Sequence, residues 1–130
     1  MPRRPPAEFE GAFEAAAREG AEALITELDP LIANHRTPIV ELVAKHRLPA
    51  MYPIADFARA GGLMAYGVTL SDLYRRAAGS VDKILKGAKP ADLPVEQPMT
   101  FDFVVNMQTA RELGITFPNE IMLQVTEVIE

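Results

Sequence analysis

Two short apolar runs and a long helical pattern follow one another in residues 48–86, LPAMYPIADFARAGGLMAYGVTLSDLYRRAAGSVDKILK. The runs Leu48–Pro53 and Leu63–Tyr66 are too short for helices and end at a proline or a glycine, so we predict two buried strands. From Leu70 to Lys86 apolar residues recur at helical spacing, and Gly87 follows as a stop signal. This stretch therefore predicts a strand, a short helical turn, a second strand and a long helix.

The same alternation continues on both sides of this stretch. Periodicity and capping residues predict further helices at 8–20, 34–47 (capped by Asn34), 55–60 and 106–113 (capped by Asn106), and strand-like runs at 21–26, 95–97 and 100–105. Short apolar strands that alternate with helices form parallel sheets covered on both faces. We therefore predict an α/β fold with a three-layer, Rossmann-like parallel sheet.

The composition excludes several classes of protein. The chain has 130 residues, 48% of them hydrophobic, which is typical of a globular domain. A net charge of −5 with scattered Lys and Arg argues against nucleic-acid binding. The absence of cysteine removes disulfides, thiolate nucleophiles and cysteine-ligated metals.

The start of the chain and its apolar runs bear on location. No apolar run approaches the roughly 18 residues of a membrane span. Residues 1–7 are rich in proline and predicted to be disordered, and no apolar run of the kind an export signal needs follows them. As written, the chain is therefore expected to be soluble and to remain in the cytoplasm.

No pattern of catalytic residues is recognisable. His35 and His46 lie eleven positions apart, without the spacing that puts two imidazoles on one helix face, so no metal site is predicted. Ser71 and Ser80 lack the glycine context of a nucleophile elbow, and the glycines match no nucleotide-binding motif. The sequence therefore predicts neither enzymatic activity nor a cofactor.

The ends of the three predicted strands carry the candidate ligand-binding residues. These are Asp29 and Pro30, Tyr52 and Pro53, and Tyr66 and Gly67. Ligands of open parallel sheets bind beyond the carboxyl ends of the strands, and two tyrosines with an aspartate offer ring faces, hydroxyls and an anion to a small amphipathic solute. The alternative is that tyrosine simply suits a strand end, and periodicity does not decide between the two.

Several linked stretches resemble one family. They are Lys45–Pro53, Ala60–Gly67, Ser71–Ala78, Val81–Gly87, Lys89–Pro98, Phe101–Asn106 and Thr109–Gly114. As a series they resemble the substrate-binding components of ABC transporters, in the branch with tryptophan- and tyrosine-binding members. The resemblance covers nearly the whole chain and is weakest before Ala21.

The resemblance implies part of a type I periplasmic-binding-protein fold, with two lobes and a solute cleft between them. Residues 8–61 would form the later part of the second lobe, 62–89 the return to the first lobe, and 90–130 the last crossings and the tail. Asp29 and Tyr52 would line the cleft and Tyr66 would lie at the hinge. The implied partners are an amino-acid-like solute and, for the full-length parent, ABC permease subunits. The implied location of the protein is the periplasm.

Members of the family are longer, which leads to two further expectations. The chain is expected to be a C-terminal fragment that lacks most of the first lobe. Its uncovered apolar faces are then expected to drive self-association, most simply as a homodimer. The alternative function is a stand-alone interaction or oligomerisation module that binds no solute.

Overall fold

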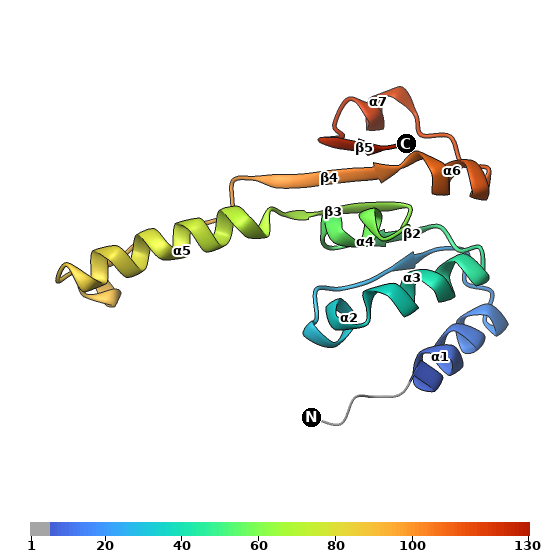
Figure 1. Cartoon of the computed structure of the whole chain (residues 1–130), viewed down its shortest axis with the longest axis horizontal. Helices are drawn as coiled ribbons and strands as arrows, with labels where there is room; N and C mark the ends of the chain where they lie inside the picture. Colours follow the sequence, from blue (N-terminus) through green and yellow to red (C-terminus); the bar gives the residue numbers. More distant parts are fainter. Residues whose placement is uncertain (1–5) are drawn as a thin grey trace.

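The computed structural model describes residues 6–130, which form a sheet with flanking helices and one projecting arm (Figure 1). In chain order the elements are α1 (Pro6–Arg18), β1 (Leu24–Ile25), α2 (Pro30–Asn34), α3 (Arg36–Lys45), β2 (Ala50–Tyr52), α4 (Ala55–Arg59), β3 (Met64–Val68), α5 (Leu70–Leu85), the 3-10 turn η1 (Pro90–Asp92), β4 (Phe101–Asn106), α6 (Met107–Leu113), α7 (Asn119–Met122) and β5 (Glu127–Ile129). The predicted disordered start lies outside the described residues, except that Pro6 and Ala7 begin α1.

The five strands form one sheet in the order β1-β2-β3-β4-β5. The first three strands are parallel, as predicted, but β4 runs antiparallel to β3, and β5 runs parallel to β4. After β3 the chain leaves the body along α5 and comes back beside it (Figure 1). It therefore enters β4 at the end of the sheet where β3 finishes, which reverses the direction of the last two strands.

Local capping explains where some helices begin. The single helix predicted from Asn34 is two helices, and Asn34 is the last residue of α2 rather than a cap. Asp29 caps α2, because its carboxylate accepts a 2.7 Å hydrogen bond from the Leu31 amide. The predicted cap of α6 is confirmed, since the Asn106 side chain accepts a 3.1 Å hydrogen bond from the Thr109 amide. Residues 95–97 form no strand.

The main hydrophobic core lies on one face of the sheet. There α3 and α4 cover the inward side chains of the strands, and α1 packs on α3. Tyr52, Phe57, Ala65 and Val104 are almost completely buried. Tyr52 on β2 stacks on Phe57 of α4, with 4.7 Å between the ring centroids. Rings and branched chains of this size account for much of the burial that stabilises a domain of this length.

Gly67 holds β3 close to the end of β2. A Cβ atom at this position would meet the carbonyl oxygen of Pro53 at far less than any normal contact distance, and would lie 2.9 Å from its carbonyl carbon. Both atoms belong to backbone, so no side-chain rotation can relieve the overlap. Glycine is therefore required here by the approach of two chain segments.

The opposite face of the sheet carries an apolar row across all five strands. In register, Ile25, Met51, Met64, Val105 and Val128 face the same side. Val105 in the middle is fully buried, whereas Ile25 on the edge strand is 76% exposed. The sheet is thus better covered at its centre than at its edges on this face.

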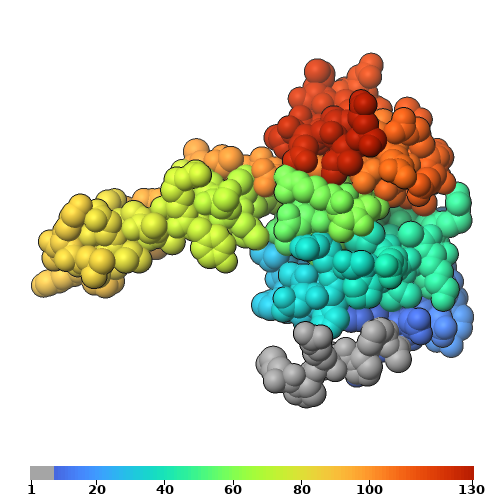
Figure 2. All heavy atoms as spheres, viewed as in Figure 1, coloured from blue at the N-terminus to red at the C-terminus, as the bar shows by residue number. Residues whose placement is uncertain are grey.

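Helix α5 projects from the body as an arm (Figures 1 and 2). All of its 16 residues lie in the described part of the chain, and none of them is buried. The returning segment contacts its polar side. There Arg76 binds the Glu96 carboxylate at 3.5 Å and the Gln97 carbonyl at 3.3 Å, and Asp72 accepts a 3.2 Å hydrogen bond from the Thr100 hydroxyl.

Candidate functional site

A hollow of about 270 Å³ lies where β2 and β3 end and β4 begins. We call it the tip hollow. Its lining residues are Ile54, Ala55, Asp56, Arg59, Val68, Thr69, Leu70, Ser71 and Asp102. They come from the segment after β2, from α4, from the junction of β3 and α5, and from the start of β4. The tip hollow therefore occupies the edge of the sheet that the sequence singled out for ligand binding.

Polar groups of both charges surround the tip hollow. Asp102 accepts a 3.0 Å hydrogen bond from the Thr69 hydroxyl. The Thr69 side chain therefore does not cap α5, the helix that follows it. Within the described chain no side chain caps α5, so its first amide groups remain available at the rim. Ser71 in the first turn of α5 is exposed and brings a hydroxyl to the same place.

The cation of the tip hollow is Arg59. Its guanidinium contacts Asp56 at 3.2 Å and Glu127 at 2.6 Å, and Asp56 also lies 3.4 Å from Arg36. The hydrogen bond with Glu127 raises the pKa of Arg59 and lowers the pKa of the Glu127 carboxyl. All four groups are partly exposed, so the network orients Arg59 more than it stabilises the fold. A zwitterionic solute would find a cation, two carboxylates and two hydroxyls on this wall.

The six residues singled out in the sequence do not form one cluster. Asp29 and Pro30 begin α2, where the Asp29 carboxylate is used as the cap. Tyr52 and Tyr66 face opposite sides of the sheet, because Tyr52 is in register with Ala65, the neighbour of Tyr66 on β3. None of the six lines the tip hollow, although Pro53 and Gly67 each directly precede one of its lining residues.

Tyr66 lies in an aromatic group on the second face of the sheet. Its ring is stacked 5.9 Å from that of Phe101 and meets Phe103 edge-on at 5.7 Å. Tyr66 is 48% exposed, so one side of this group is open to solvent. The group offers a flat apolar surface beside the tip hollow, on the other side of the sheet.

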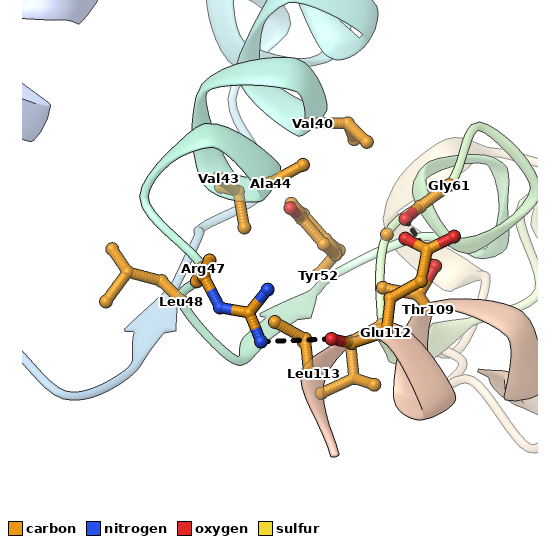
Figure 3. Close-up of a pocket in the computed structure, with 12 residues that line it drawn as sticks. Val40, Val43, Ala44, Arg47, Leu48, Tyr52, Gly61, Thr109, Glu112 and Leu113 are labelled. Atoms are coloured by element: carbon orange, nitrogen blue, oxygen red, sulfur yellow. Dashed lines mark hydrogen bonds between the residues drawn. The ribbon is translucent and has the colours of Figure 1, made fainter. Parts of the chain in front are cut away.

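Tyr52 instead lines a second, smaller hollow on the core side, which we call the inner hollow (Figure 3). It has a volume of about 60 Å³ and lies near the start of β3, at the opposite end of the sheet from the tip hollow. Its lining residues are Val40, Val43, Ala44, Arg47, Leu48, Tyr52, Gly61, Gly62, Leu63, Thr109, Glu112 and Leu113. Ligand pockets usually enclose about 300–1,000 Å³, so the inner hollow has room for little more than ordered water.

The polar groups of the inner hollow are mostly paired. Arg47, which adopts a positive φ of 52°, donates a 3.1 Å hydrogen bond to the Glu112 carbonyl, and Thr109 donates to the Gly61 carbonyl at 2.8 Å (Figure 3). The Tyr52 hydroxyl has no hydrogen-bond partner among the described residues. Burial raises the pKa of this phenol, which therefore stays protonated at physiological pH.

The two histidines are placed against α1. His35 lies 5.4 Å from the ring of Phe9, and His46 stacks on Phe13 at 5.8 Å. Across residues 6–130, no three His, Asp or Glu side chains come together in a way that could hold a metal ion. No helix in the same range is long and apolar enough to cross a membrane.

Comparison with solved structures identifies related folds. A chain described as an ABC domain in complex with L-Trp, from Streptococcus pneumoniae, matches with a TM-score of 0.84 and 27% identity. A conserved domain protein from Vibrio cholerae matches with a TM-score of 0.84 and 22% identity, and a substrate-binding protein with adhesive properties from Clostridium difficile with 0.66 and 19%. These matches cover 95%, 95% and 96% of the present chain.

The same matches cover 43%, 41% and 41% of the solved chains, so the present chain spans about two-fifths of their length. Among curated proteins, no sequence matches it closely. The family model for ABC transporter substrate binding proteins matches residues 7–129. The fold, with strand tips that surround a polar hollow, agrees with that match, and the chain belongs to the ABC transporter substrate-binding protein family.

Proposed function

We propose that this chain helps to capture a small, amino-acid-like solute for an ABC importer, without catalysing a reaction. The observation that carries the proposal is the tip hollow, which brings Arg59, Asp102, Thr69 and Ser71 to the carboxyl ends of β2 and β3. The family match over residues 7–129 and the related fold solved with L-Trp support it. Import into the cell implies a periplasmic or extracellular protein that delivers its solute to permease subunits.

The charges of the tip hollow fit the two ends of an amino acid. The solute carboxylate would bind Arg59 and the uncapped amide groups that begin α5, where the helix dipole favours an anion. The solute ammonium would bind Asp102, whose carboxylate has one hydrogen bond, from Thr69, and keeps further acceptor capacity. Asp29 and Tyr66 stay predicted contacts at the edges of this wall.

The size of the tip hollow favours a site with two walls. At about 270 Å³ and open to solvent, it lies just below the usual range of roughly 300–1,000 Å³ for sites that enclose a ligand. We therefore retain the assignment of 8–61 to the second lobe, 62–89 to the return to the first lobe and 90–130 to the last crossings. The departure of α5 from the sheet directly after β3 supports this division.

Calorimetry of the chain with a panel of L-amino acids, starting with L-Trp, tests the proposal. We expect weak binding, because a single wall buries less of the solute than two closed lobes. Asp102→Asn and Ser71→Ala should weaken it, whereas Arg75→Ala, on the exposed polar side of α5, should not. No binding of any amino acid, or equal binding by Asp102→Asn, would contradict the proposed site.

An interaction module remains the second candidate. It is favoured by the apolar side of α5, on which Tyr74 and Leu85 are exposed although the helix pattern predicts a buried face. A chain that self-associates and binds none of the amino acids would support this alternative.

A further inference from the structure

Helix α5 presents an apolar stripe that is largely exposed in the described chain. Its residues lie at helical spacing along one side of the helix: Leu70, Leu73, Tyr74, Ala77, Val81, Ile84 and Leu85. The hydrogen bonds of the returning segment go to Asp72 and Arg76, which lie outside this stripe. Leu70, at the first turn, packs against the main core and lines the tip hollow. The stripe therefore extends outward from the rim of the tip hollow.

Two pairs of stripe residues lie symmetrically about the centre of α5, whereas Leu73 and Ile84 are matched by Asp82 and Ser71. The centre of the helix falls between Ala77 and Ala78; Tyr74 and Val81 lie equally far from it, and Leu70 and Leu85 form the two ends. A two-fold contact requires such a self-complementary patch. Small residues at the centre also let two helix axes approach to about 8 Å, the close end of the normal packing range.

We infer that two copies of this chain pair through their α5 stripes, with the helices antiparallel. Leu70 would then lie beside the partner's Leu85, Tyr74 beside the partner's Val81, and the alanines would meet at the two-fold axis. The opposed helix dipoles of an antiparallel pair add a favourable term. Because Leu70 lines the tip hollow, the end of the partner's helix would cover part of its open side.

The exposed area of the stripe sets the strength of this pairing. The exposed fractions of Tyr74, Val81, Ile84 and Leu85 are 74%, 53%, 39% and 82%. Together they equal about two and a half fully exposed side chains, of which Tyr74 is aromatic and the others are smaller aliphatic chains, so the stripe offers at most about 500 Å² per copy. If the whole stripe is covered, two copies bury about 1,000 Å², which is the lower limit for a specific interface. We therefore expect a reversible dimer with a dissociation constant on the order of 10 µM or weaker.

Sedimentation velocity over a wide concentration range tests the pairing. We expect the fraction of dimer to rise with concentration in the unmodified chain. Val81→Asp places a charge in the stripe and should weaken dimerisation by at least about tenfold. Gly79→Asp is the matched control, because it adds the same carboxylate to the opposite side of α5, where a Cβ meets nothing within 4 Å. Circular dichroism confirms that both variants keep the helix.

Disulfide trapping tests the orientation of the helices. The chain has no cysteine, so any single introduced cysteine can pair only with its own copy in the partner. In an antiparallel pair, Ala77→Cys lies at the two-fold axis and should form a disulfide dimer readily. Leu85→Cys should not, because the two copies lie at opposite ends of a pair about 24 Å long.

Three results would overturn the inference. The first is a monomer at every concentration. The second is equal loss of dimer in Val81→Asp and Gly79→Asp. The third is a disulfide that forms as readily at Leu85→Cys as at Ala77→Cys, which would mean that the helices pair in parallel. The inference does not depend on the proposed function, because none of these measurements involves a solute.

Discussion

Gly67→Ala should destabilise the protein strongly although it adds only one methyl group. The new Cβ would overlap the Pro53 carbonyl group, and the overlapped atoms belong to backbone that cannot rotate away. Overpacking in a well-packed region costs about 1–3 kcal/mol, and a backbone clash belongs at the upper end of that range. Replacing glycine also restricts the unfolded chain, which offsets about 0.4–1 kcal/mol. The net loss should therefore be about 2 kcal/mol or more.

Gly79→Ala is the matched comparison for this prediction. The substitution is chemically identical, but Gly79 lies within α5, and a Cβ there meets nothing within 4 Å. Alanine should therefore stabilise the helix by about 0.5–1 kcal/mol. The two variants should thus move the stability in opposite directions.

Urea unfolding followed by far-UV circular dichroism measures both changes. For a chain of this size, a loss of about 2 kcal/mol corresponds to a fall in Tm of roughly 6–10 °C. If Gly67→Ala unfolds at the same urea concentration as the unmodified chain, the close approach of β3 to Pro53 is wrong. A matching loss in Gly79→Ala would instead show that both variants act through an effect common to any glycine replacement.

Three other substitutions test separate features of the fold. Asn106→Ala removes the cap of α6 and a buried 3.1 Å hydrogen bond to the Ala58 carbonyl. Thermal unfolding should therefore show that the free energy of unfolding falls by about 2 kcal/mol. A change no larger than the experimental error would contradict both contacts. Tyr52→Phe removes a hydroxyl that has no partner among the described residues, so the Tm should stay the same or rise, and a clear fall would indicate an ordered water at that hydroxyl. The Arg59–Glu127 pair lowers the pKa of the Glu127 carboxyl below its ordinary 4.5. The pair therefore adds to the free energy of unfolding above that pH, and this contribution is lost as the pH falls through the lowered pKa. Because both groups are half exposed the contribution should be under about 1 kcal/mol, and Glu127→Gln should abolish this part of the acid dependence in urea titrations at several pH values.

The sequence predicted the parallel part of the sheet well because its signals there are local. Leu48–Pro53 and Leu63–Tyr66 are short apolar runs with clear stops; β2 falls within the first, and β3 begins within the second and ends two residues beyond it. The cap at Asn106 was also visible, since its side chain needs only an amide three residues away. The direction of β4 has no local signal, because an alternating strand has the same pattern in either direction. It depends on how the segment after α5 returns to the sheet.

The sequence points to the edge of the sheet at which the tip hollow lies, but not to the residues that line this hollow. The carboxyl ends of the strands do surround a hollow, but Tyr52 and Tyr66 are still part of their strands, and alternation sends them to opposite faces. The lining residues come just beyond the strand ends, such as Ile54 after β2 and Thr69 after β3. Asp102 could not be assigned at all from the sequence, because it reaches the site only when β4 pairs with β3 in its observed register.

Because of the projecting arm, the chain has parts that differ in how readily they unfold. A 16-residue helix with few tertiary contacts is only marginally stable in water, so most of α5 can unwind without disturbing the sheet. Its amide hydrogens should exchange with solvent through this local opening, whereas those of β2 and β3 should exchange only when the whole domain unfolds. Hydrogen exchange followed by mass spectrometry would thus measure how firmly α5 is held, and protection of its amides that grows with protein concentration would report directly on a partner molecule.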